Sequence, residues 1–147
     1  MMALREMAIE RLKGRGMSIT RPRILILEYL MSHLTHPSVD TIYSDLLEEN
    51  PGLSKTTVYN TAQILTRKGV IRTLCIDETH VNLDGKVDPH AHLLCRCCGR
   101  IVDMPLTGIT AENASIGFKV GGNLVEEVHQ YFRGVCSDCS KKKKLTQ

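Results

Sequence analysis

Apolar residues in the first half of the chain recur at helical spacing, and capping or helix-breaking residues separate the runs. The pattern predicts a first helix over residues 2–13, which Gly14 and Gly16 end. A side-chain oxygen just before an apolar run can cap the helix that follows. Three further helices are therefore predicted after the candidate caps Thr20, Ser38 and Ser54.

The segments "VIRTLCI" and "HVNLD" alternate enough to predict a short hairpin after the fourth helix. Four helices followed by a small hairpin are typical of a winged helix-turn-helix, whose last helix enters the major groove of DNA. The outward face of this helix carries hydroxyl, amide and cationic groups, which can contact bases and phosphates; a solvated face is the alternative. The candidate DNA contacts are Tyr59, Thr57, Asn60, Ser54, Lys55 and Arg23.

The second half of the chain has a different chemistry. Five of the six cysteines follow residue 88, and the residues around them predict mostly strands. The polar, turn-rich stretch between about residues 76 and 88 predicts the boundary between the two halves. The terminal "KKKK" predicts a solvated tail.

Composition narrows the class of protein. Hydrophobic residues make up 42% of the chain and charged residues 24%, which is typical of a globular protein. We expect no membrane span, because no apolar run approaches about 20 residues. The charged N-terminus is unlike a signal peptide, so we expect a cytoplasmic protein whose cysteine pairs bind metal. A net charge of +3 is compatible with a polyanionic partner without requiring one.

Two CxxC pairs, Cys95 with Cys98 and Cys136 with Cys139, predict a closed cage of four sulfurs. This is the geometry of structural zinc, and four ordinary buried or free cysteines are the alternative. Cys97 is expected to point away from the same metal.

A second group of potential metal ligands contains no sulfur. His90 and His92 face the same way if they lie on a strand. Asp84, Asp88 and Asp103 are the nearby acids, and His36 lies in the "THPS" loop. Imidazole and carboxylate ligands suit iron(II), manganese(II) or zinc. Surface histidines without a metal are the alternative.

Three other classes explain less of the sequence. A metallohydrolase needs an open coordination position and a general base, and the chain contains no HExxH motif. A zinc-ribbon protein would account for the cysteines but not for His36 and Asp84, and a metal-storage protein has no use for the "SKTTVYN" helix. We therefore do not expect an enzyme.

Four motifs together resemble the ferric uptake regulator family: "HPSVDTIY", "LSKTTVYNTAQIL", "DPHAHLLCRCCGRIVD" and "GVCSDC". The resemblance covers nearly the whole chain. It implies an α/β homodimer with a winged helix-turn-helix DNA-binding domain and hinge over residues 1–84, and an α/β dimerisation and metal-binding domain over residues 85–147. The implied partner is a double-stranded operator, expected to be palindromic and A·T-rich.

The resemblance also implies ligands. Structural zinc is assigned to the four cysteines of the CxxC pairs, and a regulatory iron(II) or manganese(II) to His36, Asp84, His90, His92 and Asp103. Aspartates at positions 84 and 103 and the "TVYN" motif resemble the peroxide-responsive branch, in which His36 or His90 would be oxidised. An iron-uptake repressor or a zinc- or manganese-responsive repressor of the same family is the alternative.

The chain departs from the family pattern at three places. Asn82 stands where the family often has Arg, Ala91 replaces the polar or aromatic residue usual between the two histidines, and the segment over residues 120–131 is longer than usual in the family. The sequence assigns no role to Cys97, Glu112 or His129.

Overall fold

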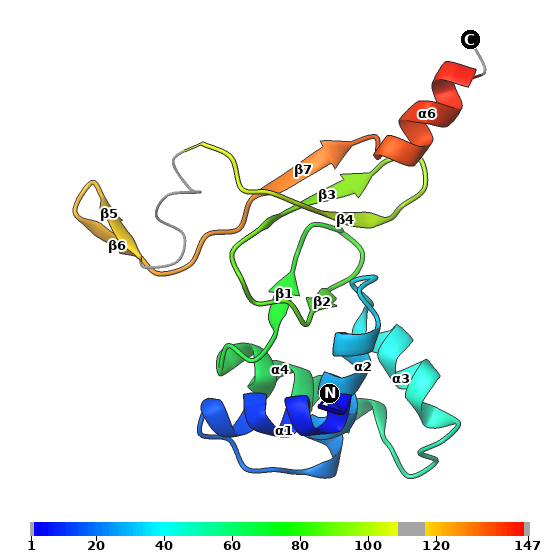
Figure 1. The fold of residues 1–147 in the computed structure, drawn as a ribbon, viewed down its shortest axis with the longest axis vertical. Coiled ribbons are helices and arrows are strands. Elements are labelled where there is room, and N and C mark those ends of the chain that lie inside the picture. Colours follow the sequence, from blue (N-terminus) through cyan, green and yellow to red (C-terminus); the bar gives the residue numbers. More distant parts are fainter. Residues whose placement is uncertain (1, 109–116, 146–147) are drawn as a thin grey trace. The chain divides into compact units, whose positions relative to one another are not determined.

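The structure is a computed structural model that describes residues 2–108 and 117–145. The chain divides into two compact units, Met1–Val87 and Asp88–Gln147. We call them the helical unit and the sheet unit (Figure 1). Within the described ranges, no helix is both long and apolar enough to span a bilayer.

The helical unit contains the predicted helices and hairpin. Its elements are α1 (Leu4–Gly14), α2 (Arg21–Ser32), α3 (Val39–Leu47), α4 (Lys55–Arg67), β1 (Arg72–Leu74) and β2 (Asn82–Asp84). Strands β1 and β2 pair antiparallel, with Arg72 opposite Asp84. This order confirms the predicted winged helix-turn-helix.

Two of the three predicted helix caps form with their side chains. The Ser38 hydroxyl accepts the Thr41 N–H at 3.2 Å, and the Ser54 hydroxyl accepts the Thr57 N–H at 3.1 Å. Thr20 does precede α2, but its hydroxyl makes no capping hydrogen bond. Pro22 in the first turn of α2 lacks an N–H, which removes one of the donors that a cap would bind.

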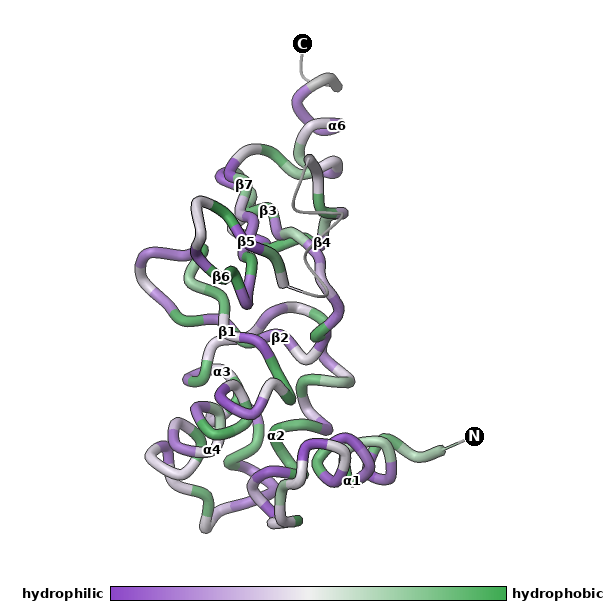
Figure 2. Tube along the Cα trace, turned by 90° about the vertical axis from the view of Figure 1, so that its left-hand side faces the viewer, coloured by the Kyte–Doolittle hydropathy of each residue, from purple (hydrophilic) through white to green (hydrophobic). Residues whose placement is uncertain are grey.

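The hydrophobic core lies in the helical unit. Inward-facing residues of all four helices form it, including Leu12, Leu27, Leu30, Ile42 and Leu65. Figure 2 shows apolar and polar residues interspersed along α4, as an amphipathic helix requires. In the sheet unit, the buried apolar residues that the structure describes are only Ala91, Cys95 and Cys136.

The sheet unit is built on three strands in the order β4-β3-β7. Strand β3 (Ala91–Cys95) pairs antiparallel with β4 (Ile101–Met104) and parallel with β7 (Tyr131–Gly134). A separate hairpin joins β5 (Phe118–Val120) to β6 (Asn123–Val125), and α6 (Ser137–Leu145) follows β7.

Helix α6 was not predicted, because the lysine run was interpreted as a solvated tail. The first turn forms at the second CxxC pair, where the Ser140 N–H donates to the Cys136 carbonyl at 2.9 Å. Lysine has a high helix propensity, so the run continues the helix once this turn exists.

Candidate metal centres and DNA-contact surface

The parallel pairing of β3 with β7 brings the two CxxC pairs to one edge of the sheet. Cys95 ends β3 and lies opposite Gly134 at the end of β7. The Arg96 N–H donates to the Gly134 carbonyl at 2.8 Å, which holds the turn after β3 beside the chain leaving β7. Gly99 completes that turn with a φ of 75°, a conformation that glycine adopts without strain.

The sulfurs of the four cysteines lie within 4.8 Å of one another. Cys98 Sγ and Cys136 Sγ are 3.8 Å apart. A tetrahedral zinc with Zn–S bonds of about 2.3 Å would separate its sulfurs by roughly the same distance. The cluster therefore fits a structural zinc ion.

Electrostatics inside the cluster favour thiolates at two of the four positions. The backbone N–H of Cys136 donates to Cys95 Sγ at 3.3 Å. This donor and the N–H of Cys98 lower the pKa of Cys95 to about 5. The N–H of Cys139 and the guanidinium of Arg100 lower the pKa of Cys136. Thiolate is the form that binds zinc, so the surrounding donors suit the metal.

Hydrogen bonding to Cys136, followed by burial, raises the pKa of Cys139 to about 12. Arg100 also pairs with Asp138 at 2.7 Å, which ties the turn after β3 to the first turn of α6. Cys97 is exposed in the same turn and is not part of the four-sulfur cluster, as expected.

A second cluster in the sheet unit joins two histidines to an aspartate across β3 and β4. His92 lies opposite Asp103 in the antiparallel pair. Nε2 of His92 is 3.5 Å from Asp103 Oδ1, and Nε2 of His90 is 3.3 Å from the same oxygen. Both histidines are buried, at 1% and 6% exposure. The two imidazoles therefore converge on one carboxylate oxygen, as expected for side chains two positions apart.

The tautomer of His90 follows from its neighbour. His90 Nδ1 lies 2.6 Å from the carbonyl of Asp88, which can only accept, so Nδ1 carries the hydrogen. When the ring is neutral, Nε2 therefore carries a lone pair, and this lone pair faces Oδ1 of Asp103. A cation between these atoms would be favourable, which is the arrangement of a metal-binding histidine. Asp88 contributes its backbone here, although its carboxylate was the group considered from the sequence.

The helical unit holds another pair of the predicted ligands. His36 Nε2 lies 3.6 Å from Asp84 Oδ2, and both side chains are about 95% buried. The Leu83 N–H donates to the Pro37 carbonyl at 2.9 Å, so the His36 loop runs beside β2. Asp84 Oδ1 accepts the Lys86 N–H at 2.8 Å, which fixes the orientation of the carboxylate.

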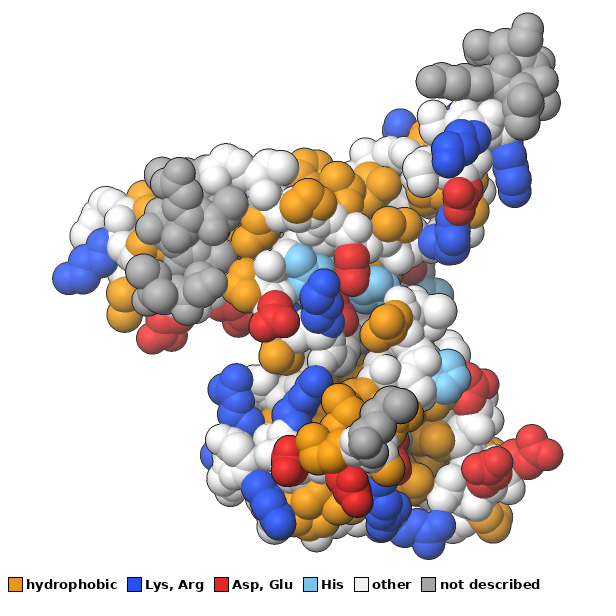
Figure 3. Space-filling model, viewed as in Figure 1, with side chains coloured by type: hydrophobic (Ala, Val, Ile, Leu, Met, Phe, Trp, Pro, Cys, Tyr) orange, Lys and Arg blue, Asp and Glu red, His pale blue; other side chains and the backbone are white. Residues whose placement is uncertain are grey.

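The predicted DNA contacts lie on α4 and at the start of α2. Tyr59 is 45% exposed, and Asn60 is also exposed. Lys55 pairs with Asp40 at 2.7 Å. The Arg23 guanidinium donates to both the carbonyl and the hydroxyl of Ser18. Acidic and basic side chains are mixed over the face of the helical unit visible in Figure 3.

Two of the predicted DNA contacts already serve the fold. The Ser54 hydroxyl caps α4 and also contacts the Thr57 hydroxyl at 2.8 Å. Tyr59 and Asn60 are therefore the more available groups for reading bases. Their role in DNA binding stays a prediction.

The sequence assigned no role to His129, Glu112 or Asn82. His129 contacts Glu127 at 2.6 Å and Tyr131 at 3.2 Å near the start of β7. Glu112 lies outside the described residues. Asn82 donates a hydrogen bond to the carbonyl of His36. In the sequence, this residue stood out only because it replaces the Arg that is frequent in the family.

Comparison with known proteins identifies the family. The ferric uptake regulator family model matches residues 14–130. The peroxide operon regulator of Bacillus subtilis is 36% identical over 135 residues, covering 92% of each chain. PerR from Streptococcus pyogenes matches in structure with a TM-score of 0.51 and 28% identity, covering 94% of each chain.

A zinc uptake regulator complexed with zinc and DNA has the same fold, with a TM-score of 0.71 at 18% identity, over 96% of this chain and 95% of that one. The chain thus belongs to the ferric uptake regulator family, and it is a metalloregulator. Proteins of this family are transcription regulators, which confirms that the chain is not an enzyme.

Proposed function

We propose that this protein is a peroxide-responsive transcriptional repressor that binds operator DNA when its regulatory metal is bound. It would act in the cytoplasm as a homodimer on a palindromic, A·T-rich duplex. The observation that carries the proposal is that each unit holds an incomplete set of ligands. The helical unit supplies His36 and Asp84, and the sheet unit supplies His90, His92 and Asp103.

Iron(II) and manganese(II) take about five or six nitrogen and oxygen ligands, so either set alone would leave several coordination positions to water. We propose that one ion takes all five side chains. Only Gly85, Lys86 and Val87 separate Asp84 from the first residue of the sheet unit. Metal binding would then favour one arrangement of the two units over others, which makes the ion a ligand with differential affinity.

The same arrangement links metal to DNA. In a homodimer, fixing each helical unit against its sheet unit fixes the spacing of two α4 helices. Half-sites in an operator lie about one helical turn apart, so a dimer with the matching spacing gains both contacts together. The four-cysteine cluster would hold zinc and take no part in this switching, since a closed site has no open coordination position.

Gel shifts on a palindromic A·T-rich duplex test this proposal. We expect manganese(II) to raise the affinity of zinc-loaded protein at least about tenfold over metal-free buffer, within the usual range of allosteric coupling. A scrambled duplex at the same salt concentration controls for phosphate-driven binding. Equal affinity with and without manganese(II) would contradict the proposal.

Peroxide sensing requires a second experiment. The proposed ligands would hold iron(II), which would supply the redox chemistry that activates peroxide. Peroxide would be the oxidant: one of its oxygens would end on the imidazole ring of His36 or His90 in place of a ring hydrogen, and the other would leave as water. An oxidised ring is a poorer ligand, so the operator would be released. The Asp103 ligand and the 36% identity with the Bacillus subtilis regulator favour this reading over iron-uptake control.

Mass spectrometry of iron-loaded protein after a brief peroxide treatment should find one added oxygen on the peptide of His36 or His90. Manganese-loaded protein provides the matched control, because manganese(II) does not reduce peroxide in this way, and its peptides should be unmodified. If the iron-loaded peptides are also unmodified while metal still controls DNA binding, the iron-uptake or manganese-responsive alternative is favoured.

A further inference from the structure

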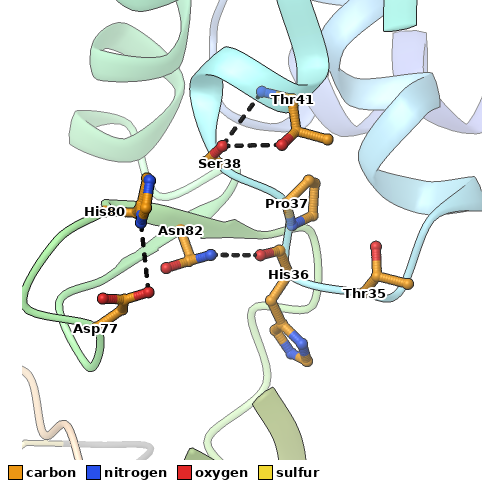
Figure 4. Close-up of a pocket in the computed structure, with 8 residues that line it drawn as sticks. All are labelled: Thr35, His36, Pro37, Ser38, Thr41, Asp77, His80 and Asn82. Carbon is orange, nitrogen blue, oxygen red and sulfur yellow. Dashed lines mark hydrogen bonds and ion pairs between the residues drawn. The ribbon is translucent and has the colours of Figure 1, made fainter. Parts of the chain in front are cut away.

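Asn82, the first residue of β2, contacts the backbone of the His36 loop. Its carboxamide Nδ2 donates to the carbonyl of His36 at 2.8 Å. Asn82 also forms an isolated bridge with Ser38. Figure 4 shows the amide directed at this carbonyl, while the imidazole of His36 extends away from the contact.

His36 needs such support because its backbone conformation is unusual. Its φ is 55°, and it is the one non-glycine residue with a positive φ in the described part of the chain. Residues with a Cβ atom are strained in this region and persist there only when their surroundings hold them. Pro37 follows, and a proline biases the residue before it toward extended backbone.

The orientation of the Asn82 amide is determined by its partners. Turning it over would place Oδ1 against the His36 carbonyl, and two acceptors repel each other. In the observed orientation, Oδ1 is buried and has no hydrogen-bond partner among the described residues. Leaving a buried acceptor unsatisfied is unfavourable. Asn82 therefore forgoes a hydrogen bond at Oδ1 while its Nδ2 donates to the carbonyl of His36.

We propose that Asn82 is a positioning residue for the regulatory metal. By holding the carbonyl of His36, it fixes the direction in which the imidazole leaves the backbone. In this arrangement Nε2 of His36 lies 3.6 Å from Asp84 Oδ2. A ligand pair that is ordered in advance loses less conformational entropy on binding. The inference rests on the proposed role of His36 and Asp84 as metal ligands.

The test is manganese(II) affinity measured by calorimetry on the zinc-loaded, full-length protein. Asn82→Ala removes the donor, and Asn82→Leu removes it while keeping a similar volume. We expect each variant to bind manganese(II) about tenfold more weakly, as is typical when a group that supports a metal ligand is lost. The zinc content should be unchanged.

Asn50→Ala is the matched control. Asn50 also donates its side-chain amide to a backbone carbonyl of the helical unit, that of Leu46 at 2.9 Å. Its loss should lower thermal stability and leave manganese(II) affinity at the parent value. A decrease in metal affinity in this variant equal to that of Asn82→Ala would show a general effect of destabilisation and would overturn the proposal.

A double-mutant cycle with His36→Ala shows whether Asn82 acts through His36. Positioning predicts that Asn82→Ala weakens binding in the parent and has almost no further effect once His36 is gone. An equal weakening in both backgrounds, or parent-like affinity of the Asn82 variants, would refute the inference. The proposed function fails separately, if His36→Ala alone binds manganese(II) like the parent.

Discussion

Cys136→Ser should release zinc from the protein and unfold the sheet unit while the helical unit stays folded. The reason is the distribution of the hydrophobic core, which lies in the helical unit. The sheet unit has few buried apolar residues among those described, and two of these are zinc-ligand candidates, Cys95 and Cys136. A small unit with so little core requires another source of stability, such as a metal.

The expected effect is large because zinc binding in such a unit is folding free energy. Structural zinc sites contribute on the order of 10 kcal/mol in small zinc-finger peptides. Cys136 is central to the cluster: its Sγ lies 3.8 Å from Cys98 Sγ and 3.6 Å from the Arg100 guanidinium, and its N–H donates to Cys95. Serine offers a harder, more weakly coordinating oxygen at the same position.

Elemental analysis and scanning calorimetry measure the outcome. We expect the variant to lose zinc and one of two unfolding transitions, and to become monomeric in gel filtration. Cys97→Ser is the matched control, because Cys97 is exposed in the same turn and should keep zinc and both transitions. A Cys136→Ser protein with a full zinc complement and the parent's melting curve would contradict the assignment of the cage.

Local sequence signals predicted the helical unit well, and the physical reason is visible at its caps. Ser38 and Ser54 bond N–H groups three positions later, so residues close in the sequence decide where α3 and α4 begin. The wing pairs two nearby segments across one loop, and an alternating pattern is enough to indicate it.

The sheet unit was predicted less completely because its contacts are distant in the sequence. The parallel partner of β3 is β7, and no local pattern links Cys95 with Gly134. The CxxC spacing nevertheless indicated that the two turns meet, because four sulfurs are needed for one zinc. Helix α6 begins where the two turns meet, so the lysine run alone did not predict it, although its described lysines are exposed as expected.

For the second metal site, the sequence indicated which histidine and aspartate side chains are candidate ligands, but not the hydrogen bonds that orient them. The Asp88 carbonyl that sets the tautomer of His90 and the Asn82 amide at His36 both involve the backbone. Side-chain type carries no information on such contacts. The positive φ of His36 occurs in a loop that pairs with β2, a contact between segments distant in the sequence.

His36→Ala should abolish the increase in operator affinity that the regulatory metal produces. Of the five proposed ligands, the helical unit supplies only His36 and Asp84. Without the imidazole, Asp84 alone would link the ion to the unit that carries α4. Only three residues separate Asp84 from the sheet unit, so this carboxylate alone would give the ion little preference between arrangements of the units. A ligand with little differential affinity shifts an equilibrium little.

The expected result is a reduction of the metal-dependent gain from about tenfold or more to nearly none in gel shifts. Zinc content and the dimer should be retained, because the four cysteines and the sheet lie in the other unit. His33→Ala is the matched control from the same loop: His33 is exposed and stacks on Tyr29 with ring centroids 4.0 Å apart. It should keep the full metal response, whereas a His36→Ala protein that responds like its parent would show that the ion does not connect the units through this side chain.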